Sequence, residues 1–299
     1  MTKRIVVTGA SGLIGRALVG ALQMRGDDVV VLPRGSGRES APTWDPVGGV
    51  LEDDILVGAD AVVSLNGAGI GDKRWTAQRK EILRSSRIRS VRLVAETMAK
   101  MENPPGTLIA GSATGYYGDA GDRLVDERSP PGDDFLAKLC GDWEAAADPG
   151  VESGMRVVHA RTGIVLSSDG GALTPLLPIF KAGLGGPIAG GSQWWSWITL
   201  ADEVAALLFL IDGDISGPVN LVSPNPVRQK EFAKALGAAL GRPAIVPAPK
   251  FAVQARLGRE LAEAIGYASQ RVAPSVLTEA GFRFASPELD DALAAVFPR

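Results

Sequence analysis

Short runs of β-branched and aliphatic residues alternate along the chain with longer segments in which apolar residues recur at helical spacing. The short runs are typical of buried strands, and the longer segments are typical of helices. The pattern predicts strands over residues 5–7, 29–32, 60–65, 107–111, 155–160 and 217–222. It predicts helices between them over residues 13–25, 75–101, 135–147 and 201–210. Strands that alternate with helices indicate an α/β fold with a doubly wound parallel sheet, the Rossmann arrangement.

The regular alternation ends near residue 166. Three of the six tryptophans fall within residues 194–197 beside glycine-rich loops, where they suit either the core or the wall of a substrate pocket. Residues 228–299 alternate short helices with proline-rich turns, which predicts a small α/β C-terminal subdomain. We therefore expect a Rossmann domain formed by residues 1–166 plus 199–222. We also expect a smaller subdomain on the substrate side, formed by residues 167–198 plus 223–299.

The first predicted strand is followed by three glycines spaced three residues apart. Gly9 permits a tight turn, and Gly12 lets the backbone approach a pyrophosphate, which would rest on the N–H groups of the next helix. Gly15 lets that helix pack closely against the sheet. An ordinary glycine turn is the alternative, but the strand–turn–helix context favours a dinucleotide-binding loop. The residues assigned to cofactor binding here are Gly9, Ser11, Gly12, Leu13, Ile14 and Gly15.

The end of the second predicted strand indicates which dinucleotide this loop would take. A site that prefers NAD usually has an acidic residue about 20 positions after the glycines, where it binds the ribose 2′-hydroxyl. Here the segment Pro33-Arg34-Gly35-Ser36 contains no acidic residue. A guanidinium group at Arg34 would pair with a 2′-phosphate, so the sequence favours NADP over NAD unless Arg34 is merely solvated. The following residues, 35–59, are rich in Gly, Pro and Asp and predict a loop.

Further cofactor contacts are predicted where the third strand ends. A polar, glycine-rich exit from a strand is where a doubly wound sheet binds its ligand, although an ordinary turn would look similar. The helix that follows carries Lys80, Arg84 and Arg87 on one face, and this face either is solvated or reaches a cofactor or substrate phosphate. The assigned residues are Ser64, Leu65, Asn66 and Gly67 from the strand exit, Lys80 and Arg87 from the helix, and Thr162 from the end of the fifth strand.

Three hydroxyl-bearing residues, Ser112, Tyr116 and Tyr117, follow the fourth predicted strand. At the carboxyl end of a strand such hydroxyls can polarise a substrate carbonyl beside a nicotinamide ring. A turn rich in small residues is the alternative, but it would not require two adjacent tyrosines. We take the three residues as catalytic candidates, with Tyr117 ahead of Tyr116 as the group that transfers a proton.

The composition excludes several other classes of protein. The longest apolar run is too short to span a bilayer, and the N-terminus leads into a strand rather than a signal peptide. The net charge of −3 gives no indication of nucleic-acid or membrane partners. One cysteine and one histidine argue against a zinc cluster, a multi-histidine metal site or a serine–histidine triad. We expect a cytoplasmic protein with a small-molecule substrate and no metal, and a homo-oligomer is compatible with the sequence.

Several motifs together resemble those of a known family. The chain contains Thr-Gly-x-x-Gly-x-x-Gly at residues 8–15 and Ser-Ala-Thr-x-Tyr at residues 112–116, and further matches continue in order to Ala280-Gly281-Phe282. This pattern resembles extended short-chain dehydrogenase/reductases, and within them the "epimerase family" proteins labelled nucleoside-diphosphate-sugar epimerases. The resemblance covers essentially the whole chain. It implies an NADP-binding Rossmann domain, a C-terminal subdomain over the cleft, and a small polar or sugar-nucleotide-like substrate.

In one respect the chain departs from the superfamily pattern. Active extended enzymes carry a Tyr-x-x-x-Lys pair on the helix after the serine strand, where tyrosine is the acid/base and lysine lowers its pKa. Alignment on Trp143-Glu144 puts Leu136 and Cys140 at these positions, and the alternative frame puts Phe135 and Leu139 there. The sequence therefore supports two hypotheses: an NADP-dependent oxidoreductase or epimerase that uses another hydroxyl, or an NADP-binding sensor or regulatory protein. A third, weaker hypothesis is a protein that binds a sugar nucleotide without NADP.

Arg34→Ala tests the expected NADP preference. A charge-assisted bidentate contact contributes about 1.5–3 kcal/mol, so the wild-type protein should bind NADPH about 10- to 100-fold more tightly than NADH. The substitution should remove most of this preference. Fluorescence titration with both cofactors measures the affinities, and equal affinities in the wild-type protein would exclude the assignment.

Overall fold

A central parallel sheet runs through the computed structural model, which describes residues 2–33 and 44–298. Within these residues the sheet has six strands in the order β12-β8-β6-β5-β1-β2, and all neighbours are parallel. This confirms the predicted doubly wound α/β fold. Ile5, Val6 and Val7 are completely buried because helices cover both faces of the sheet, which explains the unbroken apolar run in their strand. The strands are β1 (Arg4–Thr8), β2 (Asp28–Leu32), β5 (Ala61–Ser64), β6 (Thr107–Ala113), β8 (Arg156–Thr162) and β12 (Gly217–Leu221).

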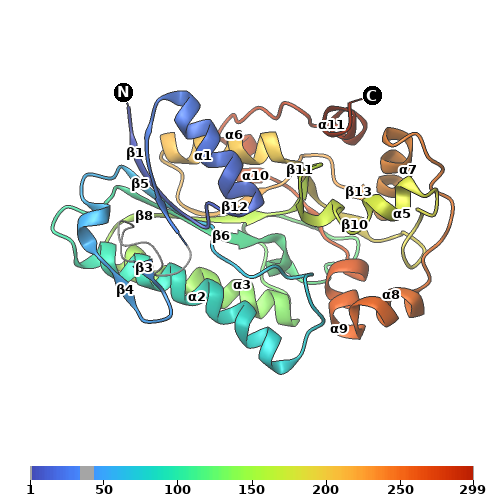
Figure 1. Cartoon of the computed structure of the whole chain (residues 1–299), viewed down its shortest axis with the longest axis horizontal. Coiled ribbons are helices and arrows are strands. Elements are labelled where there is room, and N and C mark those ends of the chain that lie inside the picture. The colour runs from blue at the N-terminus through green and yellow to red at the C-terminus, as the bar shows by residue number, and fades with distance from the viewer. Residues whose placement is uncertain (1, 34–43, 299) are drawn as a thin grey trace.

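Helices form a layer on each side of the sheet (Figure 1). One layer contains α1 (Leu13–Arg25), α6 (Leu200–Asp212) and α10 (Ser275–Glu279), which share an apolar core with one face of the strands. The other contains α2 (Ala77–Lys100), α3 (Phe135–Ala145) and α4 (Asp148–Glu152), so the single helix predicted over 135–147 is followed by a separate short one. Side chains cap three of these helices at the start. Thr76 accepts a hydrogen bond from the backbone N–H of Arg79, Asp134 accepts one from that of Ala137, and Thr199 accepts one from that of Asp202.

The segment predicted as a loop over residues 35–59 is partly structured. Trp44–Asp45 (β3) and Val50–Leu51 (β4) form a small antiparallel hairpin, and a 3₁₀ turn follows at Asp53–Leu56. Trp44 is buried in the core between the sheet and α2. The sequence missed the hairpin because strands of two residues carry no periodicity that can be read. The predicted NADP-selective residue, Arg34, lies outside the described residues.

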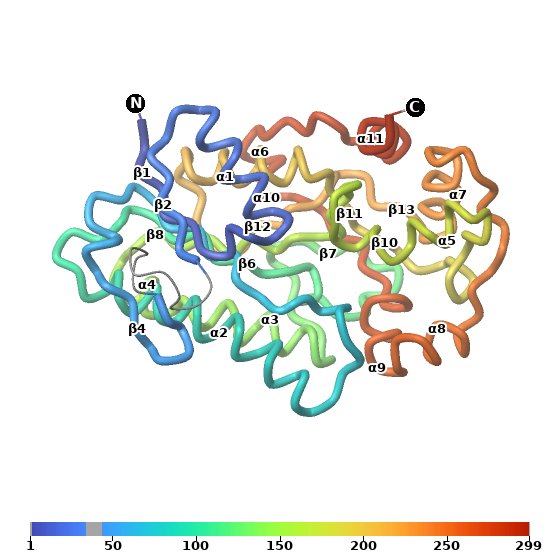
Figure 2. The backbone as a smooth tube through the Cα atoms, viewed as in Figure 1, coloured from blue at the N-terminus to red at the C-terminus, as the bar shows by residue number. Residues whose placement is uncertain are grey.

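The C-terminal region contributes a further apolar cluster built around Trp195, Trp197 and Phe232. Within the described part of the chain no helix is long and apolar enough to cross a membrane. The region's helices are α5 (Leu177–Lys181), α7 (Gln229–Ala239), α8 (Lys250–Leu257), α9 (Arg259–Ala262) and α11 (Leu289–Val296), and a π-helical turn spans Glu263–Tyr267. Figure 2 shows α5, in yellow, and α7, α8 and α9, in orange, beyond one end of the sheet. Two-stranded pairs connect the parts: β7 (Leu124–Val125) with β14 (Arg271–Val272), β9 (Ile164–Leu166) with β11 (Trp197–Thr199), and β10 (Trp194–Trp195) with β13 (Val227–Arg228).

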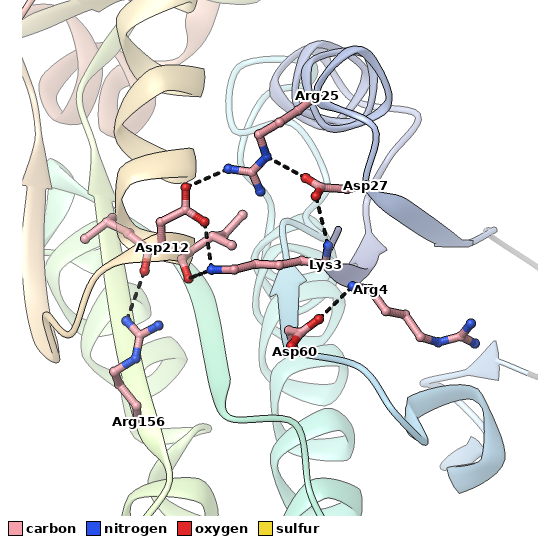
Figure 3. Close-up of polar contacts among 9 residues, drawn as sticks. Lys3, Arg4, Arg25, Asp27, Asp60, Arg156 and Asp212 are labelled. Atoms are coloured by element: carbon pink, nitrogen blue, oxygen red, sulfur yellow. Dashed lines mark hydrogen bonds and ion pairs between the residues drawn. The ribbon is translucent and has the colours of Figure 1, made fainter. Parts of the chain in front are cut away.

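Charged side chains hold the elements together at the amino ends of the strands (Figure 3). Asp212, at the end of α6, accepts hydrogen bonds from Lys3 at 2.8 Å and from Arg25 at 2.7 Å. Arg156 donates to the carbonyl oxygen of Leu210 at 3.0 Å. These contacts lie at the opposite edge of the sheet from the glycine loop. They therefore tie α1, β1, β8 and α6 together without occupying the predicted site.

Gly15 allows a close approach at the start of α1. A Cβ atom at this position would lie 2.4 Å from the carbonyl oxygen of Gly9 and 2.8 Å from the Cα atom of Ala10. Gly15 thus lets the first turn of α1 lie against the loop at the end of β1, while Leu18 and Leu22 of the same helix pack on the strands. Gly20 lies on the same helix, and apart from the helix's own backbone no atom of the described residues lies within 4 Å of a Cβ atom there.

Alanine substitutions at these two glycines should have opposite effects on stability. Gly15→Ala should lower the free energy of unfolding by about 1–3 kcal/mol, because the added methyl group overlaps backbone atoms that cannot move away freely. Gly20→Ala should raise it by about 0.5–1 kcal/mol, since alanine loses less conformational entropy in a helix. Urea denaturation measures both. A neutral Gly15→Ala would show that the loop backbone can shift.

Candidate active site

The glycine loop leaves the N-terminus of α1 open at the carboxyl edge of the sheet. Gly12 is the N-cap residue, and the structure as described, over residues 2–33 and 44–298, contains no side-chain cap for the first turn of the helix. The backbone N–H of Gly12 donates to the carbonyl oxygen of Gly9 at 2.9 Å, which closes the turn. Among the described residues beyond its chain neighbours, only this carbonyl oxygen comes within 4 Å of a Cβ atom built on Gly12, at 3.3 Å. Ser11 is exposed, and Leu13 and Ile14 are half-buried beside the open helix end. The arrangement fits an anionic group such as a pyrophosphate.

The chain that leaves β5 runs directly beside this loop. A Cβ atom at Gly9, where φ is +72°, would lie 2.6 Å from the carbonyl carbon of Leu65, so only glycine allows the contact. The hydroxyl of Ser64 is buried and shares a hydrogen bond of 3.2 Å with that of Thr8. Asn66 is also buried, and its Oδ1 atom has no hydrogen-bond partner among the described residues. A cavity of about 210 Å³ adjoins the strand exit, lined by Pro46, Val47, Asn66, Gly67, Ala68, Ser85, Ser86, Arg89 and Ser90.

The two basic residues assigned to the cofactor from α2 differ in their surroundings. Lys80 forms an ion pair with Glu260 of α9 and lies 4.9 Å from the ring centroid of Phe135, so it faces the C-terminal region. Arg87 is 8% exposed and lies against Gly67, and its guanidinium forms no ion pair with a described residue. Burial lowers the pKa of Arg87 to about 10. The structure therefore brings Arg87, but not Lys80, to the exit of β5.

A buried polar network connects the catalytic candidates. Ser112, which lies within β6 rather than after it, donates its hydroxyl proton to Glu144 at 2.6 Å. Glu144 also accepts two hydrogen bonds of 2.8 Å from Arg161 in a bidentate pair. Arg161 donates at 3.0 Å to the hydroxyl of Tyr117, which donates at 2.7 Å to the Oδ1 atom of Asn220. The network thus joins β6, α3, β8 and β12 through side chains.

The two tyrosines hold different positions relative to this network. Tyr117 is 2% exposed, and burial raises its pKa to about 12. Tyr116 is half-buried, and its ring lies 3.5 Å from the guanidinium carbon of Arg161. The hydroxyl of Tyr116 makes no hydrogen bond to any described residue. Tyr116 therefore has a ring held by Arg161 and a hydroxyl without a hydrogen-bond partner among the described residues. The hydroxyl of Tyr117, in contrast, both donates and accepts a hydrogen bond.

Comparison with known proteins identifies the family. Residues 5–221, more than half of the chain, match the NAD dependent epimerase/dehydratase family. The chain belongs to this family. Residues 248–296 match a domain of unknown function, DUF1731. The family resemblance inferred from the motifs is thereby confirmed.

Relatives cover nearly the whole chain. Epimerase family protein Mb2239 of Mycobacterium bovis is 43% identical over 291 residues, which cover 97% of this chain and 96% of that protein. Epimerase family protein SDR39U1 of Bos taurus is 39% identical over 299 residues, covering 98% and 99% of the two chains. The crystal structure of human SDR39U1 with NADPH has a TM-score of 0.88 at 34% identity, over 98% of each chain. UDP-glucose 4-epimerase of Thermus thermophilus, solved with NAD, has a TM-score of 0.73 at 18% identity, a likeness of fold alone.

In this member of the epimerase/dehydratase family, α3 presents apolar side chains where the superfamily pair would stand. Leu136, Leu139 and Cys140 are all buried. The Cβ atom of Leu136 would lie 3.3 Å from a Cβ atom at Gly115, so it fills the space beside the turn after β6. Burial raises the pKa of the Cys140 thiol to about 12, which keeps it protonated at neutral pH. None of these positions offers a proton near neutrality.

Sequence reasoning did not single out Glu144, Arg161 and Asn220 as members of the site. Arg161 carried the one available signal, because a charged residue inside a strand that is otherwise apolar must find a buried partner. Its partner Glu144 lies on α3, and Asn220, which the network reaches through Tyr117, lies on β12. The contacts between these residues therefore depend on the tertiary fold.

Thr162, which the sequence analysis assigns to cofactor binding, lies at the end of β8 and forms a hydrogen bond with a buried carboxyl group. Its hydroxyl donates to the Oε1 atom of Glu203 at 2.8 Å, while the Oε2 atom has no partner among the described residues. Glu203 is completely buried in the first turn of α6. Desolvation by burial raises its pKa to about 8, so it is mostly protonated at neutral pH.

Glu203→Gln should make stability less dependent on pH. The pKa of Glu203 is about 8 in the folded protein and about 4.5 in the unfolded chain, so the folded state binds the extra proton between these values. The contribution of this group to stability is therefore fully present below about pH 4.5, and it is lost as pH rises through 8. The variant, neutral at every pH, should match the wild-type protein at pH 5 and exceed it at pH 8, by on the order of 1–4 kcal/mol. Guanidinium denaturation at pH 5, 7 and 8 measures this difference.

Glu81 is an exposed glutamate on α2, and Glu81→Gln provides the matched control. This variant should follow the wild-type protein at every pH. If Glu203→Gln also follows it, Glu203 is ionised in the folded protein.

Proposed function

We propose that the chain is an NADP(H)-dependent oxidoreductase or epimerase that acts on a small polar or sugar-nucleotide-like substrate. The observation that carries the proposal is the open N-terminus of α1 at Gly12, which shares the carboxyl edge of the sheet with the free hydroxyl of Tyr116. Two further facts support NADP: the human relative was crystallised with NADPH, and Arg34 stands where NAD-preferring sites carry an acid.

The cofactor would be held mainly by backbone groups. The N–H groups at the start of α1 would receive the pyrophosphate, and the glycines leave room for its approach. The unpartnered Oδ1 atom of Asn66 would accept a hydrogen bond from a cofactor hydroxyl or amino group. When bound, the cofactor supplies or accepts a hydride at a substrate carbon.

Tyr116 is the residue that we propose for proton transfer. Stacking on Arg161 holds its ring, and Arg161 is in turn held by the bidentate pair with Glu144. A positioned hydroxyl without an internal partner can give its proton to a substrate oxygen or take one from it. Ser112 already donates to Glu144, so it would accept a hydrogen bond from a substrate hydroxyl rather than donate one. This assignment reverses the order of the two tyrosines expected from the sequence.

One observation favours a second function, an NADP-binding sensor or regulatory protein. Apolar residues fill the positions of the superfamily's acid/base pair, and Leu136 packs against the turn that carries Tyr116. A protein of this kind would bind the dinucleotide and change a partner's behaviour without turnover. The two proposals agree on cofactor binding and differ on chemistry.

Assays with NADPH, carbonyl compounds and sugar nucleotides separate the two functions. Once a substrate is found, Tyr116→Phe should lower kcat by about 10²–10⁴, the usual effect of losing a general acid, and should leave NADPH affinity almost unchanged. Tyr117→Phe should mainly lower the free energy of unfolding, by about 1–3 kcal/mol, because it leaves the Oδ1 atom of Asn220 without its donor. Stopped-flow kinetics and urea denaturation measure these two effects.

Gly12→Val serves as the control that cannot bind cofactor, because its side chain would enter the space above the helix end. Full turnover by Tyr116→Phe would overturn the assignment of the proton donor. NADPH binding without turnover of any substrate would favour the sensor, and no NADPH binding by the wild-type protein would refute both functions.

A further inference from the structure

Two long segments of the chain contain basic residues and no acidic ones. Residues 170–199 and 232–258 lack Asp and Glu entirely, although the whole chain has 34 of them. All the cations in these segments are exposed, and none of them forms an ion pair with a described residue. The net charge of −3 therefore does not describe this part of the surface. The cations are Lys181, Lys234, Arg242, Lys250 and Arg256.

The two acid-free segments lie side by side beyond one end of the sheet. The backbone N–H of Val246 donates to the carbonyl oxygen of Gly185 at 3.0 Å, and that of Ala248 donates to the carbonyl oxygen of Pro187 at 2.8 Å. Figures 1 and 2 both show α5, α7 and α8, which these segments contribute in whole or in part, together at that end of the molecule. The segments therefore form one continuous surface.

Large apolar side chains project from this surface. Leu184 is 60% exposed, Ile245 79%, Val246 42% and Phe251 74%. Phe251 lies in the first turn of α8, a helix that has no buried residue. Side chains of this kind are mostly buried, and a group of them exposed together marks a site of interaction with another molecule.

Each projecting side chain has a cation close to it in the sequence. Lys181 precedes Leu184 by three residues, Arg242 precedes Ile245 by three, and Lys250 comes directly before Phe251. The long stems of Lys and Arg can lie along apolar groups while their charged ends reach outward. We call these six residues, together with Val246, the apolar–basic face.

The uniform sign of the charge restricts what can cover the apolar–basic face. A second copy bound symmetrically would bring the same cations together, which is unfavourable. A protein partner would also need a complementary shape. The cavity of about 530 Å³ beside Leu240 and that of about 210 Å³ beside Asn66 are lined by none of the seven residues, so these side chains project rather than enclose a groove there.

An anionic lipid surface matches both properties of the face. It accepts apolar side chains that project from separate segments, because its headgroup layer has no fixed shape to complement. It also attracts cations at the level of its phosphates, and no acidic residue in either segment opposes that attraction. The observations therefore favour a lipid surface over an acidic protein.

We propose that the apolar–basic face binds reversibly to anionic membranes, with Ile245 and Phe251 inserted among the lipid headgroups. The contact is peripheral and leaves the dinucleotide site free. The end of α8 away from Phe251 meets the Rossmann part instead, where Arg74 donates to the carbonyl oxygen of Arg256 at 3.2 Å. This inference goes beyond the proposed function and does not depend on it.

Co-sedimentation of the full chain with lipid vesicles tests the inference. One set of vesicles contains phosphatidylcholine alone, and the other also contains about 30% phosphatidylglycerol, which supplies the negative charge. The wild-type protein should bind the second set and not the first. Its affinity should fall by about 10-fold or more between about 50 and 500 mM salt, because salt screens the attraction.

Two double variants separate the apolar and the charged contributions. Ile245→Ser with Phe251→Ser should weaken binding to the anionic vesicles by about 10-fold or more, because the apolar area that enters the headgroup layer is lost. Arg242→Gln with Lys250→Gln should weaken it by about 10- to 30-fold, since each cation near an anionic surface contributes about fivefold.

Matched controls change exposed residues elsewhere on the molecule. Met24→Ser with Val151→Ser replaces apolar residues of α1 and α4, which are 87% and 54% exposed. Lys100→Gln with Arg283→Gln removes two exposed cations outside the acid-free segments. Both controls should bind vesicles like the wild-type protein. Because all the changed residues are exposed, the unfolding midpoints should stay within about 2 °C of the wild-type value. If the Ile245/Phe251 variant unfolds, the Arg242/Lys250 variant decides.

Failure of the wild-type protein to bind anionic vesicles would overturn the inference, as would normal binding by either folded double variant of the face. Binding to polyglutamate but not to vesicles would replace it with an acidic protein partner. Light scattering provides the last outcome: a wild-type oligomer that the Ile245/Phe251 variant converts to a monomer, without vesicle binding, would show that the face joins copies of this chain.

Discussion

The close approach of two backbone segments at Gly9 is the constraint on which the site depends. The loop after β1 passes so near the carbonyl group of Leu65 that no side chain fits between them. This contact fixes the start of α1 relative to the exit of β5, and Gly15 then sets the helix against the same loop. The open end of α1, the side chain of Asn66 and the guanidinium of Arg87 beside Gly67 consequently lie at one edge of the sheet. Larger residues at these glycines would separate the groups even if every strand still formed.

Two buried arginines among the described residues differ in how they are paired. Arg161 and Glu144 satisfy each other and extend their hydrogen bonds to Ser112 and Tyr117, so this network can stabilise the packing of α3 on the sheet. Arg87 lacks such a partner. Its guanidinium therefore keeps donor groups that no described residue uses, at the exit of β5.

The sequence predicted the strands and main helices because each is long enough to show its period, and it predicted the glycine loop because three glycines hold fixed places in a strand–turn–helix unit. It missed the hairpin at Trp44, whose strands have two residues each. It placed Tyr117 ahead of Tyr116, since adjacent residues share all local signals. Only the tertiary positions of Asn220 and Arg161 show that one hydroxyl is bonded and the other free. Arg34 lies outside the described residues, so its assignment stays a prediction.

The apolar residues at the positions of the acid/base pair have a structural use of their own. Phe135 packs edge-to-face on Trp75 at 4.9 Å, and with Leu136 and Leu139 it joins a cluster that includes Ala264 from the π-helical turn of the C-terminal region. Lys80 lies over the same ring and pairs with Glu260 of α9, beside the start of α2 (Figure 2). The face of α3 that would carry a tyrosine and a lysine thus anchors the C-terminal region on the Rossmann sheet. A tyrosine restored at Leu136 would have to place its hydroxyl within this packed cluster, where a buried hydroxyl needs a partner that the cluster does not offer. The apolar residues of α3 and the docking of the C-terminal region are therefore parts of the same packing, and under the proposed function proton transfer falls to Tyr116, on the turn after β6.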